Sequence, residues 1–118
     1  MDAAVIRLQL PAGAAFLAAF DDAADKYAGR RGFADGGALF TTITSAAVRA
    51  VASASPAMIE LVAREHTAKI VTVVRGQQPA SAITQSTADA FTSAASGVAP
   101  APTLDAATAV IEFSLPLT

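Results

Sequence analysis

The sequence is poor in the residues that carry much of protein chemistry. It has no cysteine and no tryptophan, and only one histidine and one tyrosine. Without cysteine the chain can form no disulfide framework, no thiolate metal site and no cysteine nucleophile. A single histidine cannot supply the several imidazoles that many zinc sites use. We therefore expect no cofactor and no metal, and we favour a protein that is not an enzyme.

Charge is scarce as well. Only 15% of the 118 residues are charged, whereas about 25% is usual. The formal net charge is −2, which makes a nucleic-acid partner unexpected because phosphate binding requires a basic surface. Hydrophobic residues make up 53% of the chain, enough to fold. A small surface with so few charges is typical of a protein partly covered by copies of itself.

Long apolar runs are missing too. No stretch approaches the roughly 20 apolar residues of a membrane-spanning helix, so we expect no membrane partner. The chain opens Met-Asp-Ala-Ala without a basic segment before an apolar run, so we expect no secretory signal and place the protein in the cytoplasm or a virion. The length is that of one domain over residues 1–118.

Hydrophobic periodicity predicts the secondary structure. Alternating or β-branched residues indicate strands at 4–10, 38–44, 67–74 and 107–117. Three- and four-residue spacing indicates helices at 13–28 and 81–96, and alanines extend the helical pattern over 45–53. Ser55 and Pro56 resemble an N-cap and first turn, which predicts a helix over 56–65. Whether 45–53 and 56–65 form one helix or two stays open.

Two stretches near the ends of the chain are almost alike: A-V-I-R-L-Q-L-P at 4–11 and A-V-I-E-F-S-L-P at 109–116. The predicted order is strand–helix–strand over 4–44, a helical insert over 45–65, and strand–helix–strand over 67–117. This is the split βαβ, or ferredoxin-like, plan of an α+β two-layer sandwich. On that plan the first and last strands are antiparallel neighbours. Arg7 and Glu112 would then pair across them on the face away from the helices. Duplication of a βαβ unit is left open.

The strand at 67–74 is apolar on both sides. Ile70 and Val74 share one side, and Val71 and Val73 share the other. Such a strand is usually covered on both faces, and the two repeat helices can cover only one. Either the insert at 45–65 or a neighbouring subunit must cover the second face, which makes Val71 and Val73 candidate partner-binding residues.

The loop at 29–37, G-R-R-G-F-A-D-G-G, offers three further candidates for partner binding: Arg30, Arg31 and Phe33. Its four glycines make it costly to order, so we expect it to become ordered on contact with a partner. Gly29–Gly32 resembles the G-x-x-G loop with which KH domains clamp a nucleic-acid backbone. The resemblance implies an RNA-binding module, but the acidity of the chain favours a loop whose arginines match the helix dipole.

Two other patterns point to chemistry. D-D-A-A-D at 21–25 resembles the D-D-x-x-D string with which prenyl-diphosphate enzymes hold magnesium, and Asp21 and Asp25 would share a helix face. Those enzymes need a second acidic motif, which is absent here, so a solvated helix face is preferred. His66 could act as a general base near Glu60 or Glu65, but a lone histidine between a helix and a strand is more often a surface residue.

These observations favour a non-enzymatic assembly subunit that packs against copies of itself or a larger protein shell. A capsid-decorating or head–tail joining protein of a bacterial virus would fit. The first alternative is a small ferredoxin-like enzyme or ligand-binding domain with a pocket between the sheet and the helical insert. The second is the RNA-binding module built on Gly29–Gly32.

Overall fold

The computed structural model describes residues 4–34 and 36–118. Its helices and strands follow one another as β1 (Ala4–Pro11), α1 (Ala14–Arg30), α2 (Gly37–Ala52), β2 (Met58–His66), β3 (Lys69–Gln77), α3 (Gln85–Ala94), β4 (Thr103–Asp105) and β5 (Val110–Pro116). The predicted α+β class is confirmed. None of the helices in this part of the chain is long and apolar enough to cross a membrane.

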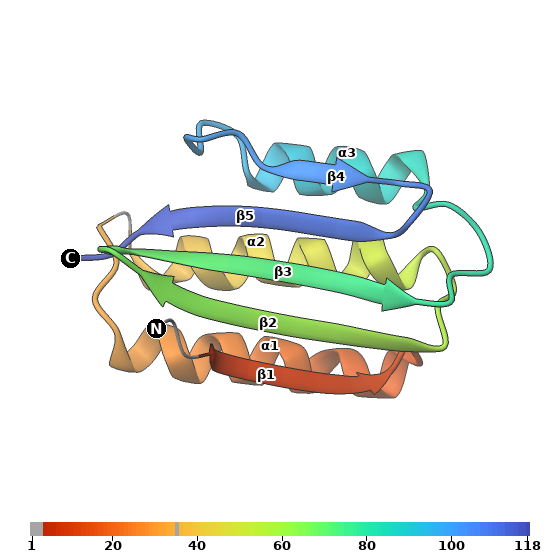
Figure 1. Cartoon of the computed structure of the whole chain (residues 1–118), viewed down its shortest axis with the longest axis horizontal. Coiled ribbons are helices and arrows are strands. Elements are labelled where there is room, and N and C mark those ends of the chain that lie inside the picture. Colours follow the sequence, from red (N-terminus) through yellow and green to blue (C-terminus); the bar gives the residue numbers. More distant parts are fainter. Residues whose placement is uncertain (1–3, 35) are drawn as a thin grey trace.

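The five strands form one antiparallel sheet in the order β1-β2-β3-β5-β4. All three helices lie on one face of this sheet, and the other face has no helix over it (Figure 1). The predicted ferredoxin-like arrangement is wrong, because β1 pairs with β2 and β5 lies between β3 and β4. The β2–β3 hairpin therefore separates the first and last long strands, and the expected Arg7–Glu112 cross-strand pair does not form.

The predicted strand at 38–44 is the first half of α2. Its β-branched and aromatic residues favour a strand locally, but they continue the helical spacing of the alanine-rich segment that follows. The buried residues of the helix recur every three or four positions: Phe40, Ile43, Thr44, Ala47, Val48, Ala50 and Val51. Burial of this continuous face against the sheet outweighs the local strand preference.

The predicted helix at 56–65 is also wrong, because Met58–His66 forms the strand β2. Its alternating burial gives the reason: Ile59, Leu61 and Ala63 are fully buried, and the residues between them are half-buried. Ser55 has φ of 50° and does not cap a helix. Consequently the helical insert ends with α2 at Ala52, and the segment after it enters the sheet.

A two-residue turn joins β2 to β3. Thr67 and Ala68 have φ of 45° and 59°, the left-handed conformation of a type I′ hairpin turn. The turn fixes the register so that His66 faces Lys69 and Val62 faces Val73. It therefore decides which side chains of the two strands share a face.

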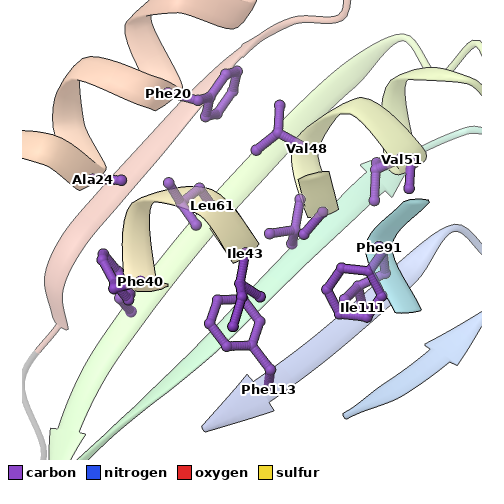
Figure 2. Packing of buried hydrophobic residues seen from close by; sticks show 14 of the residues in the cluster. Phe20, Ala24, Phe40, Ile43, Val48, Val51, Leu61, Phe91, Ile111 and Phe113 are labelled. Atoms are coloured by element: carbon purple, nitrogen blue, oxygen red, sulfur yellow. The ribbon is translucent and has the colours of Figure 1, made fainter. Parts of the chain in front are cut away.

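The core lies between the helices and the sheet. Figure 2 shows side chains of α2, including Phe40 and Ile43, in the space between the helical layer and the strands. Phe113 of β5 packs near Phe40 and Phe91, with ring centroids 6.3 and 6.4 Å apart. The two similar end segments do similar work, because Ile6 and Phe113 both face the helices.

Candidate functional site

The face of the sheet opposite the helices, which we call the open face, has no helix over it (Figure 1). Strand alternation and the pairing registers place side chains of β1, β2, β3 and β5 on this face, among them Arg7, Gln9, Glu60, Val62, Arg64, Lys69, Val71, Val73, Arg75, Val110, Glu112 and Ser114. It therefore combines four valines with charges of both signs.

A row of four residues crosses the middle of the open face. Arg7 is opposite Val62, Val62 is opposite Val73, and Val73 is opposite Glu112. Directly opposite residues in antiparallel strands have Cβ atoms about 5 Å apart, so the two valines form an apolar centre. A charge of opposite sign stands at each end of this row.

A second row lies two residues along the strands. Gln9 is opposite Glu60, and Glu60 is opposite Arg75, which in turn is opposite Val110. Here the two central positions carry the charges. A shallow depression of about 290 Å³ on this face is lined by Arg7, Glu60, Val62, Arg64, Val73 and Arg75.

Half of the lysine and arginine residues of the chain lie on this face: Arg7, Arg64, Lys69 and Arg75. Within residues 4–34 and 36–118, salt bridges form elsewhere, between Arg31 and Glu65 and between Arg49 and Asp21. The cations of the open face thus have no ion pair in the described chain. They are available to carboxylates of another molecule.

The β-branched residues of β3 are buried unequally on its two sides. Ile70 and Val74 are fully buried under the helices, whereas Val71 and Val73 are only half-buried. The insert predicted as one possible cover for the second side does not reach it. Residues 45–52 belong to α2 on the helical face of the sheet, and residues 58–65 belong to β2 within the sheet. The apolar second side of β3 therefore stays partly in contact with solvent.

A polar cluster joins α1, β2 and the end of the chain on the helical side. The Tyr27 hydroxyl donates a hydrogen bond to Glu65, and Arg31 Nε donates to the same carboxylate oxygen at 3.2 Å. The hydrogen bond from Tyr27 lowers the pKa of Glu65 against the opposing effect of desolvation, and Arg31 lowers it further. Burial and the adjacent carboxylate raise the pKa of Tyr27 far above its usual value.

This cluster anchors the predicted binding loop. Arg31 Nη1 also donates to the Thr118 carbonyl at 3.2 Å, and the Thr118 amide donates to the Gly32 carbonyl at 3.1 Å. Phe33 is buried, with its ring stacked on Phe40 at 5.1 Å. Arg31 and Phe33 therefore hold the fold together, and we do not place them on a partner-binding surface. Asp35 lies outside the described residues.

The remaining candidates are scattered. Arg30 is the exposed last residue of α1, so Gly29 and Arg30 of the G-x-x-G string belong to a helix, although 31–36 does join two helices. Asp21 Oδ2 accepts a hydrogen bond from Arg49 at 2.9 Å, and Asp25 is exposed. In the described chain no group of three metal-ligating side chains comes together.

His66 lies at the exposed end of β2, beside the hairpin turn. Alternation places it on the open-face side, whereas its neighbour Glu65 is held by Tyr27 and Arg31 on the other side. The structure therefore does not bring His66 and Glu65 together as a base and its orienting acid.

The open-face residues Glu60, Arg64 and Arg75 were missed as site residues from sequence. The predicted helix over 56–65 placed Glu60 and Arg64 on a helix surface, although the alternation in M-I-E-L-V-A-R was the signal that could have found them. In comparisons with known proteins, neither a family model nor a curated protein matches this chain.

Proposed function

We propose that the protein is a non-enzymatic assembly subunit whose open face packs against the open face of another copy of the chain. The observation that carries the proposal is the two-sided apolar character of β3. Val71 and Val73, with Val62 of β2, form an apolar strip that no helix covers. Packing a second sheet on this strip would remove it from water, which is the main driving force of protein association.

The distribution of charge supports the same function. The chain has few charges, yet four of its cations lie on this one face without a described ion pair. Two acids, Glu60 and Glu112, lie among them. A surface that mixes apolar residues with both signs of charge can be complementary to itself.

Two other concavities of the described chain do not favour a chemical site. One, of about 360 Å³, is lined by Leu39, Leu115, Pro116 and the segment 96–99. A second, of about 290 Å³, lies between α3 and β4. Neither lining contains a side chain that titrates near neutral pH. The virion role stays a prediction from the sequence.

Sedimentation velocity over a range of protein concentrations tests the proposal. Wild-type protein should sediment as a dimer or larger species, and Val73→Glu should sediment as a monomer. Ala90→Glu, an exposed position of α3, adds the same charge on the helical side and should associate like wild type. Equal association of the Val73→Glu and Ala90→Glu variants would overturn the assignment of the open face.

A further inference from the structure

We propose that two copies pack open face to open face about a two-fold axis that runs along the strands, midway between β2 and β3. This inference rests on the proposed function and gives its contact register. In it, Arg7 of each copy pairs with the partner's Glu112, and Glu60 pairs with the partner's Arg75. Each dimer thus contains four ion pairs around an apolar centre.

The first row of the open face leads to this axis. Arg7, Val62, Val73 and Glu112 occupy four successive strands at one level. A two-fold axis along the strands, midway between Val62 and Val73, exchanges the first position with the fourth and the second with the third. It therefore places Arg7 over the partner's Glu112 and Val62 over the partner's Val73.

The second row gives the same result independently. Its central residues are Glu60 on β2 and Arg75 on β3. The same axis passes between them and places Glu60 over the partner's Arg75. Two separate levels of the sheet thus become complementary under one two-fold rotation.

The alternative axis is unfavourable. A two-fold axis that crosses the strands at the level of the first row would place Arg7 over the partner's Arg7 and Glu112 over the partner's Glu112. Like charges at close range repel and suppress such a packing. Both axes keep the strands of the two sheets aligned, which is the usual arrangement when sheets pack face to face, so the charges decide between them.

The dimensions of the face suit this packing. Stacked sheets lie about 10 Å apart, a gap that an extended arginine and a glutamate can span from opposite sides. Strands about 4.8 Å apart with about 3.3 Å per residue give the four long strands a projected area of several hundred Å². That is on the order of the roughly 800 Å² per partner of a standard specific interface.

The role of Arg64 distinguishes this dimer from a complex with an unrelated acidic protein. Arg64 lies opposite Val71, so the axis places it over the partner's Val71, where it meets no acid. An acidic partner would use Arg64 together with Arg7 and Arg75, since all three line the same depression. Neutralising Arg64 should weaken binding to an acidic partner but should not weaken the dimer.

Charge reversal with mixing tests the register. The proposed dimer has two symmetry-related contacts between position 7 of one copy and position 112 of the other. In the Arg7→Glu variant both contacts place two acids together, and in the Glu112→Arg variant both place two bases together. Each variant alone should show an association constant at least tenfold below that of wild type. In a heterodimer of the two variants, each of these two contacts joins one glutamate and one arginine. Sedimentation of an equimolar mixture should therefore show a heterodimer of near wild-type affinity, which high salt weakens. Arg64→Gln should dimerise at least as well as wild type.

The possible failures are distinguishable. If Val73→Glu abolishes association but the mixture of charge-reversed variants stays monomeric, the two-fold register is overturned and the open face stands as the assembly surface. If Arg64→Gln weakens association as much as Arg7→Gln does, Arg64 contacts an acidic group that the proposed dimer does not place near it. That result also overturns the register. A wild-type protein that is monomeric at every concentration overturns both proposals. Melting curves of the variants confirm that they are folded.

Discussion

Arg7 and Glu112 stand at opposite ends of one row across the open face, with Val62 and Val73 between them. Three inter-strand spacings of about 4.8 Å separate their strands, roughly 14 Å in all. Opposite charges this far apart on a surface attract each other only weakly in salt, because the Debye length is about 8 Å at physiological ionic strength. We therefore expect these two charges to add little to the stability of one molecule and to act in the proposed dimer, where each faces the other residue type of the partner.

A double-mutant cycle on folding stability checks this separation. In dilute, monomeric protein, Arg7→Ala, Glu112→Ala and the double variant should be additive within about 0.5 kcal/mol, as expected for distant sites. Urea unfolding at physiological salt provides the measurement. A coupling energy near 1 kcal/mol would contradict the strand order, because only neighbouring strands bring these side chains into contact.

Phe113 should be among the most costly residues to truncate. It is 2% exposed and packs near Phe40 and Phe91. Phe113→Ala should cost about 3–5 kcal/mol because a cavity adds to the lost transfer energy, a large part of the roughly 5–15 kcal/mol of a typical domain. Glu112 is exposed beside it, so Glu112→Ala should hardly change the unfolding free energy when dilute protein is unfolded in urea. A mild effect of Phe113→Ala would mean that the last strand faces the other way.

Thr72 offers a stabilising substitution. It lies on the helix side of β3, fully buried, and its hydroxyl has no hydrogen-bond partner among the described residues. Thr72→Val replaces the hydroxyl by a methyl group of similar size and removes the desolvation cost of an unsatisfied polar group, about 1–3 kcal/mol. We expect a rise in unfolding free energy of about 1 kcal/mol. Thr42→Val, exposed on α2, is the control and should change little; a loss of stability in Thr72→Val would show that the hydroxyl is satisfied.

The Tyr27–Glu65 hydrogen bond should make stability depend on pH. The pKa of Glu65 is lowered in the folded protein, first by the Tyr27 hydroxyl, so its contribution is complete above the unfolded pKa of about 4.3. That contribution is lost as pH falls through the folded pKa. Tyr27→Phe should therefore destabilise the protein by about 1 kcal/mol at pH 7, and the difference from wild type should shrink below about pH 4.

Stability measured at alkaline pH provides a complementary test of the same hydrogen bond. The pKa of Tyr27 is raised in the folded protein, first by burial, so its contribution is complete below the unfolded pKa of about 10. It is lost as pH rises towards the folded pKa. Wild type should lose stability relative to Tyr27→Phe above about pH 10. A stability difference that is constant from pH 3 to pH 11 would argue against the hydrogen bond.

The candidate site was predictable in part. The two-sided apolar pattern of K-I-V-T-V-V predicts a face of β3 that something must cover, and Val71 and Val73 do lie half-buried on the open face. The charged residues around them could not be found without the sheet. Their proximity depends on cross-strand register, which brings Arg7, Val62 and Val73 together from three distant parts of the chain.

The sequence by itself determined the elements whose patterns have one solution. Clean alternation specified β1 and β5, and three- and four-residue spacing specified α1 and α3, because each periodicity places apolar side chains on one side of only one kind of backbone. Composition alone specified a folded chain with little surface charge. Element ends shifted by a few residues, where turns and caps decide.

Only the tertiary structure decided between helix and strand where both fit the pattern. Residues 38–44 have strand-forming side chains but become helical because the neighbouring turns of α2 bury the same face. Residues 58–66 become a strand because β1 and β3 on either side satisfy their backbone hydrogen bonds. Strand order follows from such pairing between distant segments, and local sequence does not encode it. With β2 and β3 in the middle of the sheet, Arg7 and Glu112 are kept apart and the open face acquires its charged rows.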